Sequence, residues 1–456
     1  MSATMTMAQK VVELTYAELP TPVITKCKEL ILDAVACGVG GIQTPIGQAA
    51  LELMRQMGGH PHATVLGADD RGPCGLAAYT NASAINAQDY DDTGHSGHPG
   101  ASIISAALAL GEKLGATGQS IILACLAGYE VGTRVAAAIE PSWERYRQIH
   151  GIGTAQTFGS MAACAKLLEL DLAATLNAFG VAGATAPVAH AGKFGWADKS
   201  IAYIKDNVAW PAEAGLRAAL LAQMGYEGSE SILDGNQGYW VMAGSDRCDF
   251  ERLIDFSDYE IMNVSLKPYP CCRWIHTTLD ALGKLAVENH FEPSEIVGIE
   301  VFSTQPLADY FGRKDPRTFV DVEFSIPCAV ALKLHGVPHS AWFHRESWAD
   351  TEVLDTASRV SVTMEDEYQR LYLKLGRLSH RIPARVAVTL TGGDKLVQYC
   401  DLASGSPEKP MDSQSVRAKV LDLTDARMTP ESQARLIEQV ENLDGIDDIR
   451  QVLAEI

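Results

Sequence analysis

The sequence lacks the features that indicate a nucleic acid or a membrane as a partner. Its 456 residues include 37 Lys and Arg against 57 Asp and Glu, a formal net charge of −20, and the basic residues form no cluster. Nucleic acids and anionic membranes are bound by clustered Lys and Arg. No run of eighteen apolar residues occurs, and the first nine residues lack the basic and apolar regions of a signal peptide. We therefore expect a cytoplasmic protein with neither partner.

The sequence also has no regular cysteine spacing. Its ten cysteines are scattered, and most lie within apolar runs, as Cys27, Cys37, Cys125 and Cys164 do. Buried cysteines of this kind behave as small hydrophobic residues, and reduced thiols fit a cytoplasmic setting. No internal repeat or low-complexity segment is present.

The first part of the chain has helical periodicity. Apolar residues make up 47% and charged residues 21%, as in globular proteins, and the length suggests two domains. The spacing predicts helices over 22–39, 45–57, 74–88, 102–114, 120–137, 155–168, 172–183 and 212–224. We expect the glycines at 38, 40 and 41 to end the first helix. They lack the preceding strand and the Lys of a phosphate-binding loop, which disfavours a nucleotide site.

The pattern changes after residue 265. Alternating β-branched segments predict strands over 296–303, 359–364, 384–390 and 395–400, and helical spacing persists over 274–290 and 325–335. We expect a mainly α fold, with a large all-helical domain (1–265) and a smaller α+β domain (266–403). The charged amphipathic tail (404–456) is expected to pack back on the helical domain.

The loop 86–102 has the highest density of titratable groups, among breaking glycines and a proline. Its polar side chains are Asp89, Asp91, Asp92, Thr93, His95 and His98. His95 and His98 could share a metal, but no further His or Cys lies nearby, and we expect none. His98 is better suited to proton transfer, although a hydrogen-bonded structural role is equally open. Asp91, Asp92 and His95 are expected to hold the loop's shape.

Three further polar segments are candidates for the same site. Residues 145–154 precede a helix and could bind a carboxylate, or Thr154 could simply cap that helix. Lys205 also precedes a helical run. The segment 266–276, stiffened by two prolines, joins the expected domains and carries Lys267 and His276. A nucleophilic role for Cys271–Cys272 is disfavoured, since no Cys–His protease pattern surrounds them.

Together these motifs resemble the MmgE/PrpD family, which includes 2-methylcitrate dehydratase, cis-aconitate decarboxylase and iminodisuccinate epimerase. The similar segments are Asp89-Tyr90-Asp91-Asp92-Thr93 with His98-Pro99-Gly100, residues 150–159, Lys205, Lys267-Pro268-Tyr269-Pro270 with His276, Phe324-Ser325-Ile326-Pro327, and Arg381-Ile382-Pro383-Ala384. The resemblance implies a large helical domain, a smaller lid-like α+β domain, a homodimer, and cofactor-independent lyase or isomerase chemistry on small di- or tricarboxylates.

The resemblance also implies roles for individual residues. The decarboxylase's site corresponds to Asp89, Thr93, His98, His150, Lys205 and Lys267 in this chain. At two further substrate-binding positions, Cys272 replaces a histidine and Cys328 replaces a tyrosine, and His276 completes the set. These replacements weigh against decarboxylation of cis-aconitate. Tyr146 could supply acid–base function in their place, as an epimerase would need.

The expected function is that of a dehydratase-like lyase acting next to a carboxylate. Lys205 and Lys267 would bind substrate carboxylates, and His98, with Tyr146 or Lys267, would move the proton. Asp89 belongs to this catalytic group, and Thr93 and His150 to the substrate-binding one. An epimerase or racemase, a decarboxylase and a non-catalytic carboxylate-binding protein are the alternatives.

Overall fold

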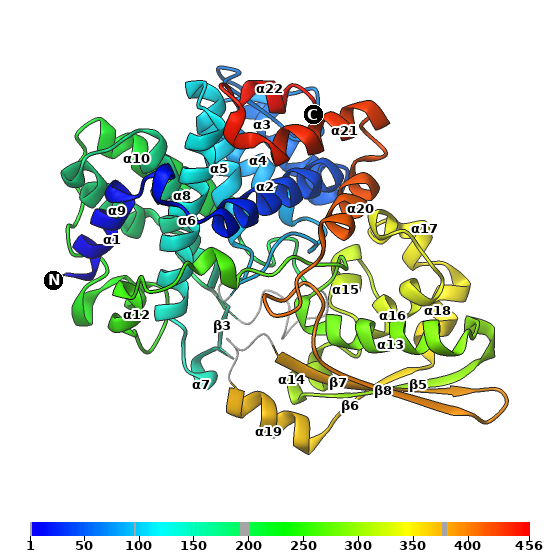
Figure 1. The fold of residues 1–456 in the computed structure, drawn as a ribbon. Coiled ribbons are helices and arrows are strands. Elements are labelled where there is room, and N and C mark those ends of the chain that lie inside the picture. Colours follow the sequence, from blue (N-terminus) through cyan, green and yellow to red (C-terminus); the bar gives the residue numbers. More distant parts are fainter. Residues whose placement is uncertain (1, 95–96, 147, 151, 192–200, 376–380) are drawn as a thin grey trace.

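The computed structural model describes residues 2–94, 97–146, 148–150, 152–191, 201–375 and 381–456. Figure 1 shows a large helical part, blue to green, beside a smaller part with a four-stranded sheet. The expected fold class, mainly α with a smaller α+β part, is confirmed.

Nine helices make up most of the helical part: α1 (Ala3–Glu13), α2 (Thr21–Gly41), α3 (Pro45–Met57), α4 (Cys74–Asn86), α5 (Pro99–Leu114), α6 (Gly118–Ala138), α8 (Gln156–Leu167), α9 (Leu172–Thr185) and α10 (Ala209–Gln223). All but α1 were predicted. The buried residues of α1 are mostly Ala and Thr, and only Met7 and Val11 are large apolar side chains, so few residues mark this helix in the sequence. Helix α6 is long and apolar enough to cross a membrane, but 94% of its apolar window is buried inside the protein, as in a core helix.

Helix α2 continues through Gly38 and Gly40 and ends at Gly41, two residues beyond its predicted end. A Cβ at Gly41 would lie 1.8 Å from the main-chain oxygen of Ala84 on α4, and one at Gly40 would lie 3.0 Å from Leu423. The missing side chains let α2 approach both neighbours closely. This packing offsets the weak helix propensity of glycine.

The smaller part contains a mixed sheet with the strand order β6-β5-β7-β8. The strands are β5 (Ile296–Ser303), β6 (Val360–Met364), β7 (Arg381–Leu390) and β8 (Lys395–Leu402), all near their predicted positions. β5 pairs in parallel with β6 and antiparallel with β7, and β7 pairs antiparallel with β8. Helices α13 (His276–Asn289) and α16 (Ile326–Leu334) bury apolar side chains in the same core as the sheet. Four of the shorter helices are α14 (Gln305–Tyr310), α15 (Phe319–Glu323), α17 (Arg345–Trp348) and α18 (Thr351–Ser358), and α19 (Asp366–Leu375) precedes β7.

The C-terminal helices pack against the start of the chain. These helices are α20 (Ser413–Thr424), α21 (Pro430–Glu441) and α22 (Arg450–Leu453), drawn in orange to red near the blue α2 in Figure 1. Val420 and Leu436 share a core with Leu30 and Ile31 of α2. The tail therefore returns to the helical part, while the residue limits of the two domains stay a prediction.

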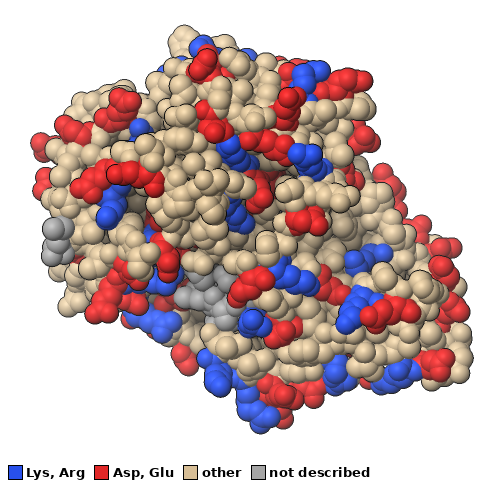
Figure 2. Space-filling model, viewed as in Figure 1, with Lys and Arg blue, Asp and Glu red and all other residues tan. Residues whose placement is uncertain are grey.

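Charged side chains of both signs are scattered among uncharged residues on the face drawn in Figure 2, where Lys and Arg are interspersed with Asp and Glu. By contrast, the side chains of Lys205 and Lys267 are buried.

Candidate active site

The loop between α4 and α5 is held in shape by its own carboxylates. Asp92 accepts hydrogen bonds from the main-chain nitrogen of Gly100 (3.0 Å) and from the hydroxyl of Tyr129 (2.6 Å). A Cβ at Gly100 would lie 2.6 Å from that hydroxyl oxygen, so only glycine allows the approach. Burial, followed by the nearby charge of Asp91, raises the pKa of Asp92 to about 7. The prediction that Asp92 supports the loop is confirmed.

The same loop is joined to the segment that carries Lys267. Thr93 and Ser265 form an isolated two-way main-chain bridge, with N···O distances of 2.9 and 2.8 Å. The hydroxyl of Tyr90 donates to the main-chain oxygen of Pro268 at 3.3 Å. These contacts fix the two sequence-distant segments side by side.

Asp89 lies at the centre of a buried cluster of charges. Its backbone adopts a φ of 49°, a left-handed conformation that Asp tolerates better than most residues. Its Oδ1 lies 3.1 Å from Nζ of Lys205, and its Oδ2 lies 3.1 Å from Nζ of Lys267. Nε2 of His98 is a third neighbour, also at 3.1 Å. Burial alone would raise the pKa of Asp89, but the two lysines and His98 outweigh it and hold this pKa well below its usual range.

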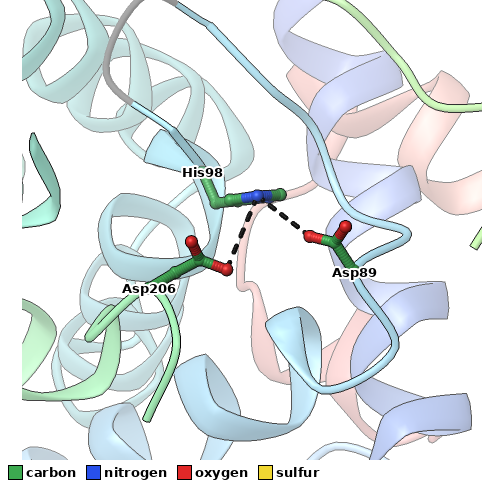
Figure 3. Close-up of side chains that lie close together, drawn as sticks. All are labelled: Asp89, His98 and Asp206. Atoms are coloured by element: carbon green, nitrogen blue, oxygen red, sulfur yellow. Dashed lines mark ion pairs between the residues drawn. The ribbon is translucent and has the colours of Figure 1, made fainter. Parts of the chain in front are cut away.

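His98 is surrounded by carboxylates. Figure 3 shows its ring, at the start of α5, between Asp89 and Asp206. Nδ1 lies 3.0 Å from Oδ1 of Asp91, and Nε2 lies 3.7 Å from Asp206. Burial would lower the pKa of His98, but Asp91, Asp206 and Asp89 together raise it to about 10. At neutral pH the side chain is therefore an imidazolium, which can donate a proton but cannot accept one.

Lys205 is buried among three carboxylates. Its Nζ lies 3.0 Å from Asp206, 3.1 Å from Asp89 and 3.5 Å from Glu323. Burial would lower its pKa, but these anions raise it well above the usual lysine value. Lys205 is thus a permanent cation whose nearest anions belong to the protein.

Lys267 is fully buried, and the N–H donors of its ammonium group make no hydrogen bond within the described part of the chain. Asp89 lies within ion-pairing distance, yet within the described part of the chain Nζ has no hydrogen-bond partner of suitable geometry. An ammonium carries three N–H donors. These donors are consequently available to an acceptor that enters the site.

A cavity of about 270 Å³ reaches the cluster at Asp206. Its wall is formed by α3, α4 and the segment before α10, and includes Asn86, whose side chain donates to Asp91. This cavity reaches Asp206, one of the carboxylates beside His98 and Lys205.

Three of the side chains have a spacing that a metal ion could bridge. Asp89, His98 and Asp206 each offer a ligand atom within 4.8 Å of the other two. The ammonium of Lys205 already lies about 3 Å from both carboxylates, so a divalent cation would have to displace it. This donor set therefore fits a lysine-based ion cluster better than a metal centre.

Tyr146, predicted as an acid–base group, lies at a different place. It ends α7 (Trp143–Tyr146), and its ring stacks on Trp143 with a centroid distance of 5.8 Å. Both rings line a cavity of about 180 Å³ that also includes Trp274 and Phe311. The structure thus places Tyr146 in an aromatic cavity where the two parts of the molecule meet, and its catalytic role stays a prediction.

The two cysteines predicted at the site differ in surroundings. Cys272 follows the Lys267 segment and donates its main-chain N–H to the oxygen of Glu323 at 2.8 Å. Burial, followed by the charge of Asp89, raises its thiol pKa to about 12. Cys328 is buried in α16 within the core of the smaller part, where burial raises its pKa to about 11. Both thiols are therefore protonated at neutral pH.

The remaining predicted histidines cannot be placed as substrate ligands. His276 is fully buried, with Nε2 at 3.1 Å from the oxygen of Cys271 and Nδ1 at 3.1 Å from the guanidinium of Arg273. Burial and the charge of Arg273 hold its pKa well below the usual value, so it is neutral. His150 lies in the short strand β3 (Ile149–His150), paired with β4 (His190–Ala191), but its side chain is outside the described structure, as is His95.

The structure therefore brings together Asp89, His98, Lys205 and Lys267, with Thr93 bracing the loop. Sequence reasoning missed the acidic partners Asp206 and Glu323, and it assigned Asp91 to loop shape alone. Two signals were present: Asp206 directly follows Lys205, and Glu323 directly precedes the Phe324–Pro327 motif. Neither signal reveals that both carboxylates face one ammonium.

Comparison with known proteins covers almost the whole chain. Residues 5–251 match the MmgE/PrpD N-terminal domain, and residues 269–445 match the MmgE/PrpD C-terminal domain. Cis-aconitate decarboxylase of Homo sapiens is 25% identical over 465 residues, covering 98% of this chain and 93% of the relative. The protein of the same name from Mus musculus is 24% identical over 470 residues (98% and 92%), and that from Aspergillus terreus is 25% identical over 467 residues (96% and 92%). With both domains matched in order, the chain belongs to the MmgE/PrpD family.

Proposed function

We propose that this protein is a lyase that acts by proton transfer next to a carboxylate of a small di- or tricarboxylic acid. The observation that carries the proposal is the buried group of three cations, His98, Lys205 and Lys267, around the single carboxylate of Asp89. Family membership and the decarboxylase names of the relatives support lyase chemistry on such acids.

Lys267 is the proposed carboxylate anchor. Its free N–H donors can bind a substrate carboxylate without breaking its pairing with Asp89. Asp89 keeps three cations in one place before the substrate arrives, so little reorganisation is needed when negative charge develops. Lys205, whose anionic neighbours lie on several sides, contributes mainly its field to this site.

The proton-transfer step places negative charge on a substrate carboxylate that these cations would contact. Removing a proton from the carbon next to a carboxylate, or losing carbon dioxide from it, shifts an electron pair onto that carboxylate. The positive charges of Lys267 and of the imidazolium of His98 stabilise the resulting enediolate. Since His98 is protonated at rest, it acts as a fixed positive charge, and the starting base must be another group.

We favour dehydration among the lyase reactions. By the resemblance to the family, Cys272 and Cys328 take the places of a histidine and a tyrosine of the decarboxylase. Their thiols stay protonated at neutral pH. Such thiols cannot replace a histidine in proton transfer. The same replacements favour, as a second candidate, an epimerase at a carboxylate-bearing carbon.

Proton NMR in deuterated water tests the proposal on citrate-, aconitate-, tartrate- and aspartate-like acids. A dehydratase forms an unsaturated acid from a hydroxy acid, and a decarboxylase releases carbon dioxide and gains one deuteron at carbon. An epimerase exchanges the α-proton without forming an alkene. Tight binding of an acid with neither turnover nor exchange would contradict the proposal and favour a non-catalytic binding protein.

A further inference from the structure

Glu323 is a buried carboxylic side chain of the site that no sequence motif identified. It ends α15 in the smaller part of the molecule and faces Lys205 of the helical part at 3.5 Å. Its side chain is almost fully buried, and within the described residues neither carboxyl oxygen has a hydrogen-bond partner. Its main-chain oxygen accepts a hydrogen bond from Cys272, which fixes its position. A buried carboxyl group without hydrogen bonds is costly and calls for an explanation.

Charge compensation in the cluster is unequal. Asp89 has three cationic neighbours, Lys205, Lys267 and His98. Asp206 has Lys205 at 3.0 Å and His98 at 3.7 Å, and its side chain is partly exposed. Within the described residues, Glu323 has Lys205 as its one ion-pairing neighbour, and this is the longest of that lysine's three pairs. The most weakly compensated of the three carboxylates is therefore the one that should carry a proton.

The charged groups around Glu323 come from several elements. Among the described residues they include Lys205 and Asp206 before α10, Asp89 in the loop after α4, and Lys267, and the neutral thiol of Cys271 is also nearby. Burial first, together with Asp89 and Asp206, raises the pKa of Glu323 well above its usual range, against the opposing effect of the two lysines.

We propose that Glu323, on the wall of the site that the smaller part forms, is protonated in the resting protein and is the proton donor of the reaction. This inference rests on the proposed lyase function. His98 and Lys205 hold their protons too tightly to be efficient donors at neutral pH, because a donor works best when its pKa lies near the working pH.

In a dehydration, the donor step transfers the Glu323 proton to the leaving hydroxyl group of the substrate. The O–H bond of Glu323 breaks as its proton bonds to the leaving hydroxyl oxygen, and the C–O bond breaks to release water. The O–H electron pair stays on the Glu323 carboxylate, which Lys205 then stabilises. The electron pair of the broken C–H bond forms the C=C bond as the C–O electron pair leaves with the oxygen. The base that takes the carbon-bound proton passes it to solvent, and one proton from solvent restores the Glu323 acid.

The protonation state can be tested without knowing the substrate. Difference infrared spectra of wild type and Glu323→Gln should show the carbonyl band of a protonated carboxylic acid at neutral pH, lost in the variant. Glu346→Gln, at an exposed position of α17, is the matched control and should lose only a carboxylate band. Loss of a carboxylate band from Glu323→Gln would overturn the proposal.

Stability gives a second readout. Replacing a neutral acid by a neutral amide of the same shape should leave the melting temperature close to that of wild type. If Glu323 were instead an ionised partner of Lys205, the same change would break a buried ion pair and lower the melting temperature by many degrees. That loss would also overturn the proposal.

Kinetics test the catalytic part once a substrate is found. Glu323→Gln should lower kcat by about 10²–10⁴-fold, the usual contribution of a general acid, with little change in KM. Glu346→Gln should keep wild-type kcat. If wild type turns over an acid and Glu323→Gln keeps its kcat, the donor role fails and the lyase proposal survives. If wild type turns over no acid, the lyase proposal and the donor role both fail, while the infrared result still decides the protonation state.

Discussion

The ammonium of Lys419 donates a hydrogen bond to the main-chain oxygen of Lys267 at 3.1 Å, so the C-terminal helix α20 holds the site from behind. Lys419 donates a second bond, at 2.6 Å, to the main-chain oxygen of Tyr90, next to Asp89. The charge of Lys419 is balanced by Asp33 of α2 at 2.5 Å, and both side chains are buried. One side chain of the tail thus fixes both chain segments that carry the Asp89–Lys267 pair.

Lys419→Met is therefore expected to destabilise the protein and to weaken catalysis. The change leaves Asp33 as an uncompensated buried charge, which costs about 3–5 kcal/mol, and it frees the two main-chain segments. Urea unfolding measures the first effect, and kcat/KM of the folded variant measures the second.

Two variants separate positioning from simple loss of charge. The double variant Asp33→Asn, Lys419→Met removes the stranded charge and should recover much of the stability while kcat/KM stays low. Lys284→Met, on the exposed surface of α13, should change neither quantity. Full activity in the folded double variant would refute the positioning role.

The sequence predicted most of the fold because the signals were local. Strand β5 and helix α3 were predicted at their observed limits, and twelve further helices and strands lie within about three residues of their predicted ends, because apolar periodicity depends only on near neighbours. Gly40 shows the limit of such reasoning. Whether glycine ends a helix or allows close packing depends here on Leu423, which is more than 380 residues away in the sequence.

The site was predicted in part for the same reason. His98 and Asp89 lie in one dense polar loop, and Lys205 and Lys267 interrupt apolar segments, so each attracts notice in the sequence. Glu323 and Lys419 do not, because a glutamate before a helix and a lysine in a charged tail are usually exposed. Their burial follows from how α15 and α20 meet the loop, which is tertiary information.

Asp89→Asn should be among the most destabilising substitutions of the cluster. The amide leaves Lys205, Lys267 and His98 without their shared counter-charge, a cost of about 3–5 kcal/mol or more. Asp69→Asn, at a fully exposed position, is the control. Urea unfolding at pH 7 should show the difference, and equal midpoints for the two variants would contradict the central role of Asp89.

Acid sensitivity should report on the same residue. The pKa of Asp89 in the folded state lies well below its unfolded value of about 3.9, so its contribution is fully present above that pH and is lost as pH falls towards the folded pKa. As pH falls below about 5, the free energy of unfolding should thus decrease more for wild type than for Asp89→Asn. Parallel pH profiles would count against this assignment.

Lys267→Met should lower kcat/KM by about 10²–10³-fold, the usual effect of removing one electrostatic donor from an active site. Methionine fills similar space but offers no N–H to a substrate carboxylate. Lys284→Met again serves as the control. Calorimetric titration with the best substrate should show the matching loss of affinity in the folded variant, whereas unchanged binding and turnover would exclude Lys267 as the carboxylate anchor.

His98 should stay protonated far above the pH at which an ordinary histidine titrates. Its pKa of about 10 in the folded state exceeds the unfolded value of about 6.5. The stabilisation from its ion pairs is therefore fully present below about pH 6.5 and is lost as pH rises towards 10. The melting temperature of wild type should fall more steeply over that window than that of His98→Gln, while His344→Gln, at an exposed position, should follow wild type. In NMR spectra of histidine-labelled protein, the resonance missing from His98→Gln should not titrate between pH 6 and 8.5. A midpoint near 6.5 would show that the surrounding carboxylates do not hold the imidazolium, and His98 could then serve as a base.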